Sequence, residues 1–342
     1  MVRLDRPGEL SVRGRSAIAR LPPQDRRDPL EPLSATWSHD LIAVPGLACL
    51  YDLDGRRIDA TVHRRHGLPV RRVPERIDPP SDLDRVREPV VYGGHLPKHF
   101  GHFLLESLAR TWVYPHLQPG PLPFVHFRDR FHLHEEDLLG AVLAPSGAVP
   151  MGIAGPTRFD AVLIPEQGMD LGSAYAPEMR AVFDTIRDVI VGGTPQPDDT
   201  PVYLSRTRLP ADRRATLGEV ALERRLQAAG VRIVHPQEQP LREQIALISR
   251  ARTVIGLHGT ALHLTILRDI DGARTVALNP RLPHPPQQHV DLLRGSEHVH
   301  LHVQYPLHPR LLGVRGGRAL EIGRYRNLVL PRSAARRVLR LL

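Results

Sequence analysis

Three side chains that can move protons or bind metal, His99, His102 and Glu106, lie close together in the stretch 99–114. Apolar residues recur in this stretch at helical spacing, which predicts a helix. The three side chains stand at positions i, i+3 and i+7 and therefore share one face of that helix. Such a face is suited to general acid–base chemistry in a cleft, with Glu106 or His102 as the base.

Two other interpretations of this face stay open. Two imidazoles and a carboxylate are common zinc or iron ligands, although the spacing differs from the i, i+4 histidine pair of metalloproteases. Alternatively, the histidines are structural and are satisfied by hydrogen bonds at a domain boundary. We predict a site without a metal.

A second candidate site lies in the stretch 241–267, which is typical of a helix, a strand, a tight turn and a second helix. The strand is the β-branched run Thr253 to Leu257, and the turn follows at 256–261. A turn of this kind points backbone N–H groups and the positive end of a helix dipole at a ligand above the strand, which favours phosphate. A purely structural turn is the alternative, because the same pattern recurs in most α/β proteins.

Composition limits the function classes. The chain has 342 residues and 41% hydrophobic residues, enough for two globular domains. Cys49 is the only cysteine, which excludes an internal disulfide and a zinc site made of thiolates. We recognise neither a signal peptide nor a long apolar run, and therefore expect a cytoplasmic protein.

The charge of the chain suggests an alternative function. A net charge of +9 and a pI near 10.4 fit a non-catalytic protein that binds a polyanion, nucleic acid or acidic glycan, on an α/β scaffold. However, Lys98 is the only lysine, so the arginines reflect a compositional bias. Aromatic residues make up only 5% of the chain, which leaves few platforms for stacking bases. A metal hydrolase built on the histidines is a third hypothesis.

The order of strand-like and helix-like segments predicts two α/β domains. An irregular N-terminal arm (1–40) precedes an N-terminal α/β domain (41–192), and a linker rich in Gly, Pro and Asp (193–201) follows it. Repeated strand–helix units then indicate a Rossmann-like C-terminal domain (202–330), with ligands at the carboxyl ends of its strands. A basic helix (331–342) ends the chain.

Three segments, taken in order, resemble glycosyltransferase family 61, the DUF563 group that includes bacterial capsular polysaccharide enzymes. They are HFGHFLLESLAR at 99–110, VYLSRTRLPADRR at 202–214 and VHPQEQPLREQIALISRARTVIGLHGTALHLTIL at 234–267. The resemblance covers about half of the chain. Together with the domain pattern it implies a GT-B-like fold, in which two Rossmann-like domains face a cleft.

The resemblance also implies roles for individual residues. The catalytic residues would be Glu106 and His102, and His95 and His99 would lie on the acceptor side. One departure from the family pattern is the turn itself, where Thr260-Ala261 replaces the second glycine. The implied donor-binding residues are Arg206, Arg213, Arg214, Glu243, Gln244, His258, Gly259, Thr260 and Ala261.

These assignments describe an inverting, metal-independent hexosyl- or pentosyltransferase without a cofactor. Its arginines and helix N-termini would stabilise the diphosphate of a nucleotide-sugar donor, which we expect to be UDP-linked. The base would take the proton of the acceptor hydroxyl. We expect a glycan or lipid-linked glycan acceptor in capsular or other surface polysaccharide synthesis, at the inner face of the membrane, with peripheral membrane contact through the C-terminal helix as a minor alternative. We expect no nucleic-acid partner.

Overall fold

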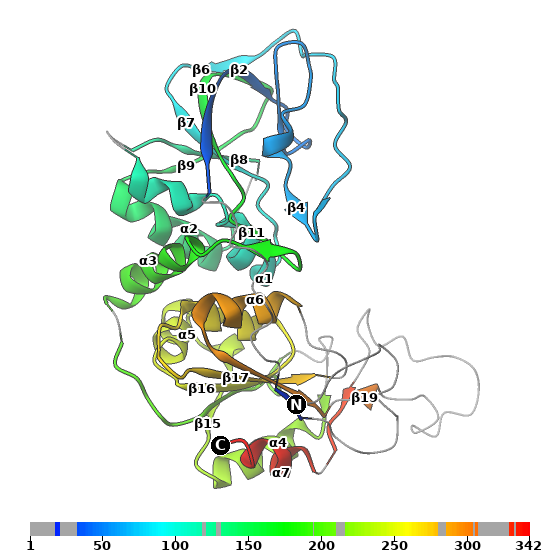
Figure 1. Cartoon of the computed structure of the whole chain (residues 1–342), viewed down its shortest axis with the longest axis vertical. Coiled ribbons are helices and arrows are strands. Elements are labelled where there is room, and N and C mark those ends of the chain that lie inside the picture. Colours follow the sequence, from blue (N-terminus) through cyan, green and yellow to red (C-terminus); the bar gives the residue numbers. More distant parts are fainter. Residues whose placement is uncertain are drawn as a thin grey trace, which may run out of the picture. The chain divides into compact units, whose positions relative to one another are not determined.

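The computed structural model describes residues 18–20, 33–117, 121–127, 131–193, 195–209, 216–279, 285–303, 305–306, 328–331 and 333–342. The chain divides into two compact units (Figure 1). The N-terminal unit comprises residues 26–194, and the C-terminal unit comprises residues 195–342 together with residues 1–25. Each is described separately below.

The sheet of the N-terminal unit is mixed. Its strands lie in the order β3-β2-β10-β7-β8-β9, and β6 pairs with β10. Buried apolar residues of β7, β8 and β10 form the centre of its core, among them Val90, Val125 and Phe159. The strands are β2 (Ala35–Ala43), β3 (Leu50–Tyr51), β6 (Asp84–Val86), β7 (Val90–Gly94), β8 (Phe124–His126), β9 (Pro150–Gly152) and β10 (Thr157–Pro165).

The sheet is mixed because β2 runs antiparallel to β10 along its whole length, whereas β6, β7, β8 and β9 are paired in parallel. We expected an irregular arm over 1–40, but β1 (Ile18–Arg20) and the first residues of β2 are strands. The physical reason is the same for both strands: they are held by partners far along the chain, and only the last three residues of β2 are buried, so an apolar pattern is absent.

The predicted helix over 99–114 is divided into three pieces. These are α1 (Phe100–His102), a π-helical turn η2 (Phe103–Ser107) and a 3-10 helix η3 (Thr111–His116). Single π-helical turns are rare and are found frequently at functional sites. The other helices of the unit are η1 (Asp59–Thr61), α2 (Leu133–Leu143), η4 (Ala144–Ser146) and α3 (Met179–Val191), and two small hairpins are β4–β5 (Arg64–Arg65 and Leu68–Pro69) and β11–β12 (Met169–Asp170 and Ala174–Tyr175).

The C-terminal unit has a doubly wound sheet. Its strands lie in the order β15-β13-β16-β17-β18, all parallel, and β1 is added antiparallel beside β18. In chain order this is the arrangement 2-1-3-4-5 of flavodoxin-like sheets. The strands are β13 (Val202–Leu204), β15 (Arg232–Val234), β16 (Thr253–Leu257), β17 (Arg274–Asn279) and β18 (Glu297–His302).

Helices cover both faces of this sheet. The first face carries α4 (Glu219–Ala228) and α7 (Ala334–Leu339), whose apolar residues join those of the strands in one core. On the other face η6 (Thr260–Leu267) contacts both α5 (Leu241–Ile248) and α6 (Pro285–Arg294) (Figure 1). Short elements complete the unit: β14 (Thr216–Leu217), η5 (Pro236–Glu238), β19 (Tyr305–Pro306) and β20 (Leu328–Val329).

Local details of the C-terminal unit differ from the sequence predictions. The helix α4 begins at Glu219, because Thr216 lies in the strand β14 and Gly218 is the capping residue. The second apolar helix is the 3-10 helix η6. Within the predicted linker, Asp198 pairs with Ala251, so this part of the linker is tied to the sheet unit. In the predicted basic helix, Val338 is buried but Leu342 is 46% exposed.

Among the described residues, no helix is both long and apolar enough to span a bilayer.

Candidate active site

Two glycines turn the chain from β7 toward the first group of candidate residues. Gly94 has a φ of 80°, a left-handed conformation that glycine adopts without strain. A Cβ at Gly93 would lie 2.2 Å from the ring of Phe124, so a side chain there would push β8 away. The chain therefore leaves β7 sharply, and His95 and the α1–η2 segment follow.

Glu106 lies at the centre of this group and is fully buried. Its carboxylate accepts two hydrogen bonds from the guanidinium of Arg65, from Nε at 2.5 Å and from Nη2 at 2.6 Å. Nδ1 of His102 lies 3.2 Å from the same carboxylate, and Nε2 of His63 lies 3.8 Å from it. The structure thus brings the two predicted catalytic residues together and adds Arg65 and His63 to them.

Side-chain hydrogen bonds to backbone carbonyls hold the segment that carries His63 and Arg65. The hydroxyl of Tyr92 donates to the carbonyl of Thr61 at 2.8 Å, and Nη2 of Arg110 donates to that of Ala60 at 2.9 Å. The guanidinium of Arg110 also lies over the Tyr92 ring, 5.2 Å from its centroid. Beyond these contacts the β4–β5 hairpin closes through two residues of positive φ, as two-residue hairpin loops do.

The charge of Glu106 is fixed by its partners. Burial opposes its ionisation. The two hydrogen bonds from Arg65, together with the nearby imidazoles of His102 and His63, outweigh burial and lower the pKa of Glu106 below the ordinary value. Removing one partner of a buried pair leaves an uncompensated charge and costs about 3–5 kcal/mol. A buried carboxylate that stays ionised and is held by Arg65 is a poor proton acceptor. Its geometry suits it to orient His102.

His102 has the geometry of a general base. Its Nδ1 faces the Glu106 carboxylate, which favours the tautomer with the proton on Nδ1 and leaves the lone pair on Nε2. Its side chain is 37% exposed, so a substrate can reach it. His99 lies beside it, with ring centroids 5.2 Å apart, and is exposed. Of the two candidates, the geometry favours His102 over Glu106 as the base.

His95 is half-buried and contacts His63 edge to face, with centroids 6.0 Å apart. Burial, and next the positive charge of Arg71, lower the pKa of His95 to about 4. Because the unfolded chain binds this proton near pH 6.5 and the folded chain does not, the free energy of unfolding should rise with pH between about 4 and 6.5. We expect the melting temperature of His95→Gln to change less with pH across this window than that of the wild-type protein.

The measurement is the melting temperature at several pH values from 4 to 7. The stabilising contribution of Glu106 is lost only as the pH falls below its ordinary pKa of 4.5. The pH dependence due to His95 is therefore measured mainly above pH 4.5. The exposed His39 on β2 supplies the control variant His39→Gln. If the His95 and His39 variants show the same pH dependence as the wild-type protein, burial of a neutral His95 is not the cause.

The second group of candidate residues lies at the carboxyl ends of β13 and β16. From β13 the chain passes to α4 on one face of the sheet, whereas from β16 it passes to η6 on the other. The point where neighbouring strands diverge in this way is where doubly wound sheets bind ligands. Arg206 follows β13 and Gly259 follows β16, and a Cβ at Gly259 would lie 3.8 Å from Nη1 of Arg206.

Carboxylates of α4 hold the Arg206 loop in place. The backbone N–H of Arg206 donates to Oε1 of Glu219 at 2.9 Å, and so does the Tyr203 hydroxyl at 3.0 Å. The hydroxyl of Thr207 donates to Glu223 at 2.8 Å, and the Ser205 hydroxyl donates to the same oxygen. The loop is therefore fixed on both sides of Arg206.

The other predicted donor residues have different positions. The Gln244 amide donates to the carbonyls of Pro236 and Gln239, at 2.8 and 2.9 Å, and so holds the η5 turn. Glu243 is exposed in the first turn of α5. The backbone N–H of His258 donates to the carbonyl of Leu278 at 2.9 Å. Thr260 and Ala261 begin η6, while Arg213 and Arg214 lie outside the described residues.

Sequence reasoning missed His63 and Arg65. The run His63-Arg64-Arg65-His66 before a glycine was the available signal, and it lies in a region rich in arginine and proline. In the part of the chain that the structure describes, no three His, Cys, Asp or Glu side chains are arranged to hold a metal ion. The acidic stretch Asp52-Leu53-Asp54 forms a turn, in which Asp52 accepts the backbone N–H of Arg56 at 2.8 Å.

Comparison with known proteins adds one match. The family model described as Glycosyltransferase 61 matches residues 100–274, just over half of the chain. The matched region includes His102 and Glu106 as well as Arg206 and Gly259. No curated protein matches the chain.

Proposed function

The chain belongs to glycosyltransferase family 61 and is a glycosyltransferase, and from this premise we propose that it transfers a sugar from a nucleotide-sugar donor by inversion and without a metal. Membership in the family implies a sugar donor and a glycan acceptor. The observation that carries the proposal is the position of Arg206 beside Gly259 at the divergence of β13 and β16. A guanidinium and nearby backbone N–H groups are the donors that a leaving diphosphate requires.

In the proposed reaction each unit supplies one function. Arg206, His258 and the Gly259–Ala261 turn of the C-terminal unit bind the donor diphosphate, and a UDP-linked sugar is the proposed donor. Nε2 of His102, in the N-terminal unit, takes the proton of the acceptor hydroxyl as its oxygen attacks the anomeric carbon and the nucleoside diphosphate leaves. His95 and His99 are proposed to lie on the acceptor side, and the GT-B arrangement predicted from the sequence belongs to this proposal.

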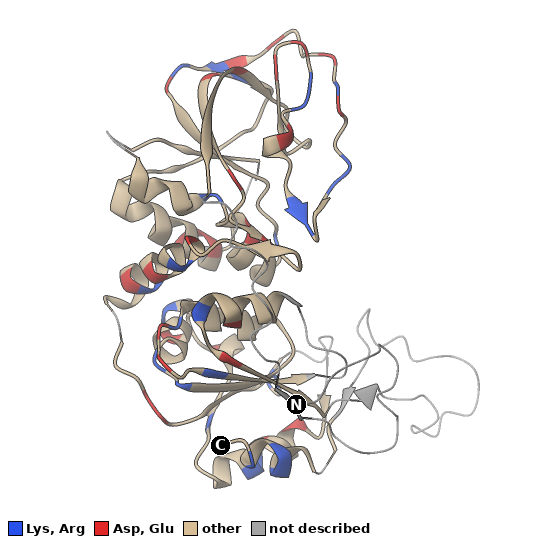
Figure 2. Ribbon diagram, in the orientation of Figure 1, with Lys and Arg blue, Asp and Glu red and all other residues tan. Residues whose placement is uncertain are grey.

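The polyanion-binding alternative has less support. Figure 2 shows acidic and basic residues close together on several helices, for example on α3. Several arginines are engaged by nearby carboxylates, for example Arg85 by Asp160 and Arg252 by Asp199. We therefore prefer the transferase function to polyanion binding. We propose that the enzyme acts in capsular or other surface polysaccharide synthesis in the bacterial cytoplasm. Peripheral contact of the basic C-terminal segment with the membrane is a subsidiary proposal.

A panel of nucleoside diphosphates tests the proposed function. We expect one of them, UDP first, to raise the melting temperature, since a ligand at 100 times its Kd stabilises the folded state by about 2.7 kcal/mol. The shift should persist in EDTA, and a shift that requires Mg²⁺ or Mn²⁺ would contradict metal independence. If no nucleoside diphosphate changes the melting temperature while nucleic acid binds in a salt-dependent manner, the polyanion alternative is favoured.

A further inference from the structure

The helix that follows the Gly259 turn has an unusual conformation. Eight residues, Thr260–Leu267, form the 3-10 helix η6, although 3-10 runs longer than three or four residues are uncommon. Over eight residues a 3-10 helix is longer than an α-helix by about 4 Å, because its rise per residue is about 2.0 rather than 1.5 Å. The strands before and after η6 are fixed in the sheet. A change to an α-helix would therefore have to be absorbed by the turn at 258–260 or by residues 268–273, which lead to β17.

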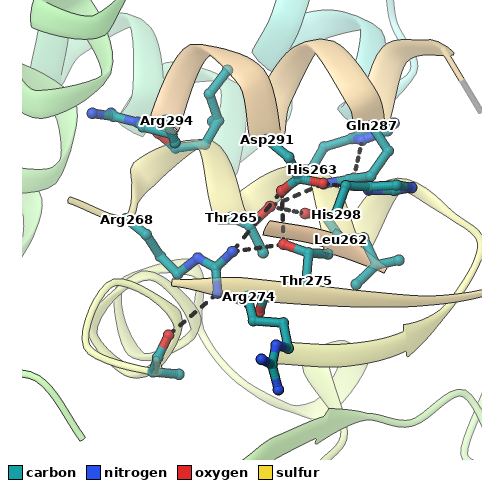
Figure 3. A network of polar contacts seen from close by, with 12 residues as sticks. Leu262, His263, Thr265, Arg268, Arg274, Thr275, Gln287, Asp291, Arg294 and His298 are labelled. Atoms are coloured by element: carbon teal, nitrogen blue, oxygen red, sulfur yellow. Dashed lines mark hydrogen bonds and ion pairs between the residues drawn. The ribbon is translucent and has the colours of Figure 1, made fainter. Parts of the chain in front are cut away.

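Side chains of α6 hold the middle of η6. Nδ1 of His263 lies 2.9 Å from Oε1 of Gln287, and Nε2 of Gln287 donates to the hydroxyl of Thr265 at 3.1 Å (Figure 3). His263, Thr265 and Gln287 are all buried. One amide of α6 thus bonds two residues of η6 that are two positions apart, and this spacing is set by the winding of η6.

The last turn of η6 is fixed by arginines. Arg268 follows it directly and is fully buried; its guanidinium donates to the carbonyl of Arg274 at 3.0 Å and to the hydroxyl of Thr275 at 2.6 Å. Nε of Arg294, the last residue of α6, donates to the carbonyl of Ile266. The C-terminal end of η6 is therefore held by contacts with β17 and with α6.

Asp291 joins these contacts into one network. Its carboxylate accepts the Thr275 hydroxyl at 2.7 Å and Nε2 of Gln287 at 3.3 Å, and it lies 2.6 Å from Nδ1 of His298 and 4.0 Å from Nη2 of Arg268 (Figure 3). Asp291 is 1% exposed. Within this buried network the carboxylate of Asp291 therefore faces the guanidinium of Arg268.

A buried polar network of this kind adds little net stability compared with apolar residues of the same shape, because burying its groups is costly. Such a network does fix the conformation of the segments that it joins, because each polar group must keep its hydrogen-bond partner. The apolar residues of η6 would pack in either helical form. The hydrogen bonds of Gln287 are made to the 3-10 form.

We propose that Gln287 and Asp291 are positioning residues, which hold η6 in the 3-10 conformation and thereby place the turn at 258–260 for the donor diphosphate. This proposal rests on the proposed function, because the turn is assigned there to donor binding. Neither residue touches the donor in the proposed reaction. Their effect is transmitted through His263 and Thr265.

The test uses Gln287→Met, which keeps the shape of the side chain and removes both hydrogen bonds to η6. The milder variant Thr265→Val removes only the hydroxyl and serves if the first does not fold. The matched control is Val290→Ala, a buried apolar change on the same helix. Each protein is measured for its melting temperature, its Kd for the nucleoside diphosphate and its amide hydrogen exchange over 258–267.

We expect Gln287→Met to raise the Kd about tenfold, equivalent to about 1.4 kcal/mol, and to speed amide exchange over 258–267. The KM for the donor should rise, while the KM for the acceptor stays unchanged. Val290→Ala should lower the melting temperature without either effect. Wild-type affinity and exchange in both polar variants would overturn the proposal. If the wild-type protein binds no nucleoside diphosphate, the proposed function fails, and unchanged exchange over 258–267 then still overturns the role of Gln287.

Discussion

Replacement of His102 by alanine is expected to lower kcat by about 10²–10⁴-fold, the usual contribution of a general base. The Glu106 carboxylate orients the imidazole through Nδ1, 3.2 Å away, so the variant removes the proton acceptor and leaves the carboxylate bound to Arg65. Since His102 is 37% exposed, its loss should change the melting temperature little. Donor affinity should also stay unchanged, because the proposed donor residues belong to the other unit.

The measurement is kcat with saturating donor and acceptor, together with nucleoside diphosphate binding. His39→Ala, an exposed histidine on β2, is the control. Added imidazole should restore part of the lost activity in His102→Ala, since it can act as the base in the space that the side chain vacates. A kcat equal to that of the His39 variant would show that another group accepts the proton. Glu106→Ala is less informative, because it also leaves the Arg65 charge unpaired.

The sequence predicted the contact between His102 and Glu106 because it is local. Residues four apart in a helical segment face the same side, and this holds although the segment is interrupted by a π-helical turn. The contact of Arg65 with Glu106 spans 41 positions and comes from the short β4–β5 hairpin. Nothing in the hydrophobic pattern of such a short polar hairpin shows which helix it will contact. The sequence therefore could not decide between Glu106 and His102 as the general base. The contact of Glu106 with Arg65, seen only in the structure, favours His102.

In the C-terminal unit the strands were predictable, but the conformation after the turn was not. Thr253 to Leu257 is a β-branched apolar run between polar residues, a strong local signal for a buried strand. The apolar run after Gly259 fits an α-helix and a 3-10 helix equally, and the side chains that decide between them, such as Gln287, lie more than twenty positions away. A buried Arg268 likewise has no local signal, because most arginines are exposed.

Replacement of Arg206 by alanine is expected to abolish most of the donor affinity. A hydrogen bond to a charged group contributes about 1.5–3 kcal/mol, so loss of the guanidinium should raise the Kd for the nucleoside diphosphate by roughly 10–150-fold. The loop itself should persist, because Glu219 holds it through the backbone N–H of Arg206, which alanine retains. Arg206→Lys should give an intermediate Kd, since a lysine keeps the charge but cannot bind two phosphate oxygens in parallel.

Isothermal calorimetry of the three proteins measures this effect, and Arg208→Ala is its matched control. Arg208 lies two positions further along the same loop, is exposed, and pairs with Glu238. If the guanidinium of Arg206 contacts the diphosphate directly, only the Arg206 variants lose affinity for the nucleoside diphosphate. Equal losses in the Arg206 and Arg208 variants would mean that a diffuse positive charge attracts the ligand, and the losses should then fall with added salt. A salt-resistant loss confined to Arg206 would locate the diphosphate beside Gly259.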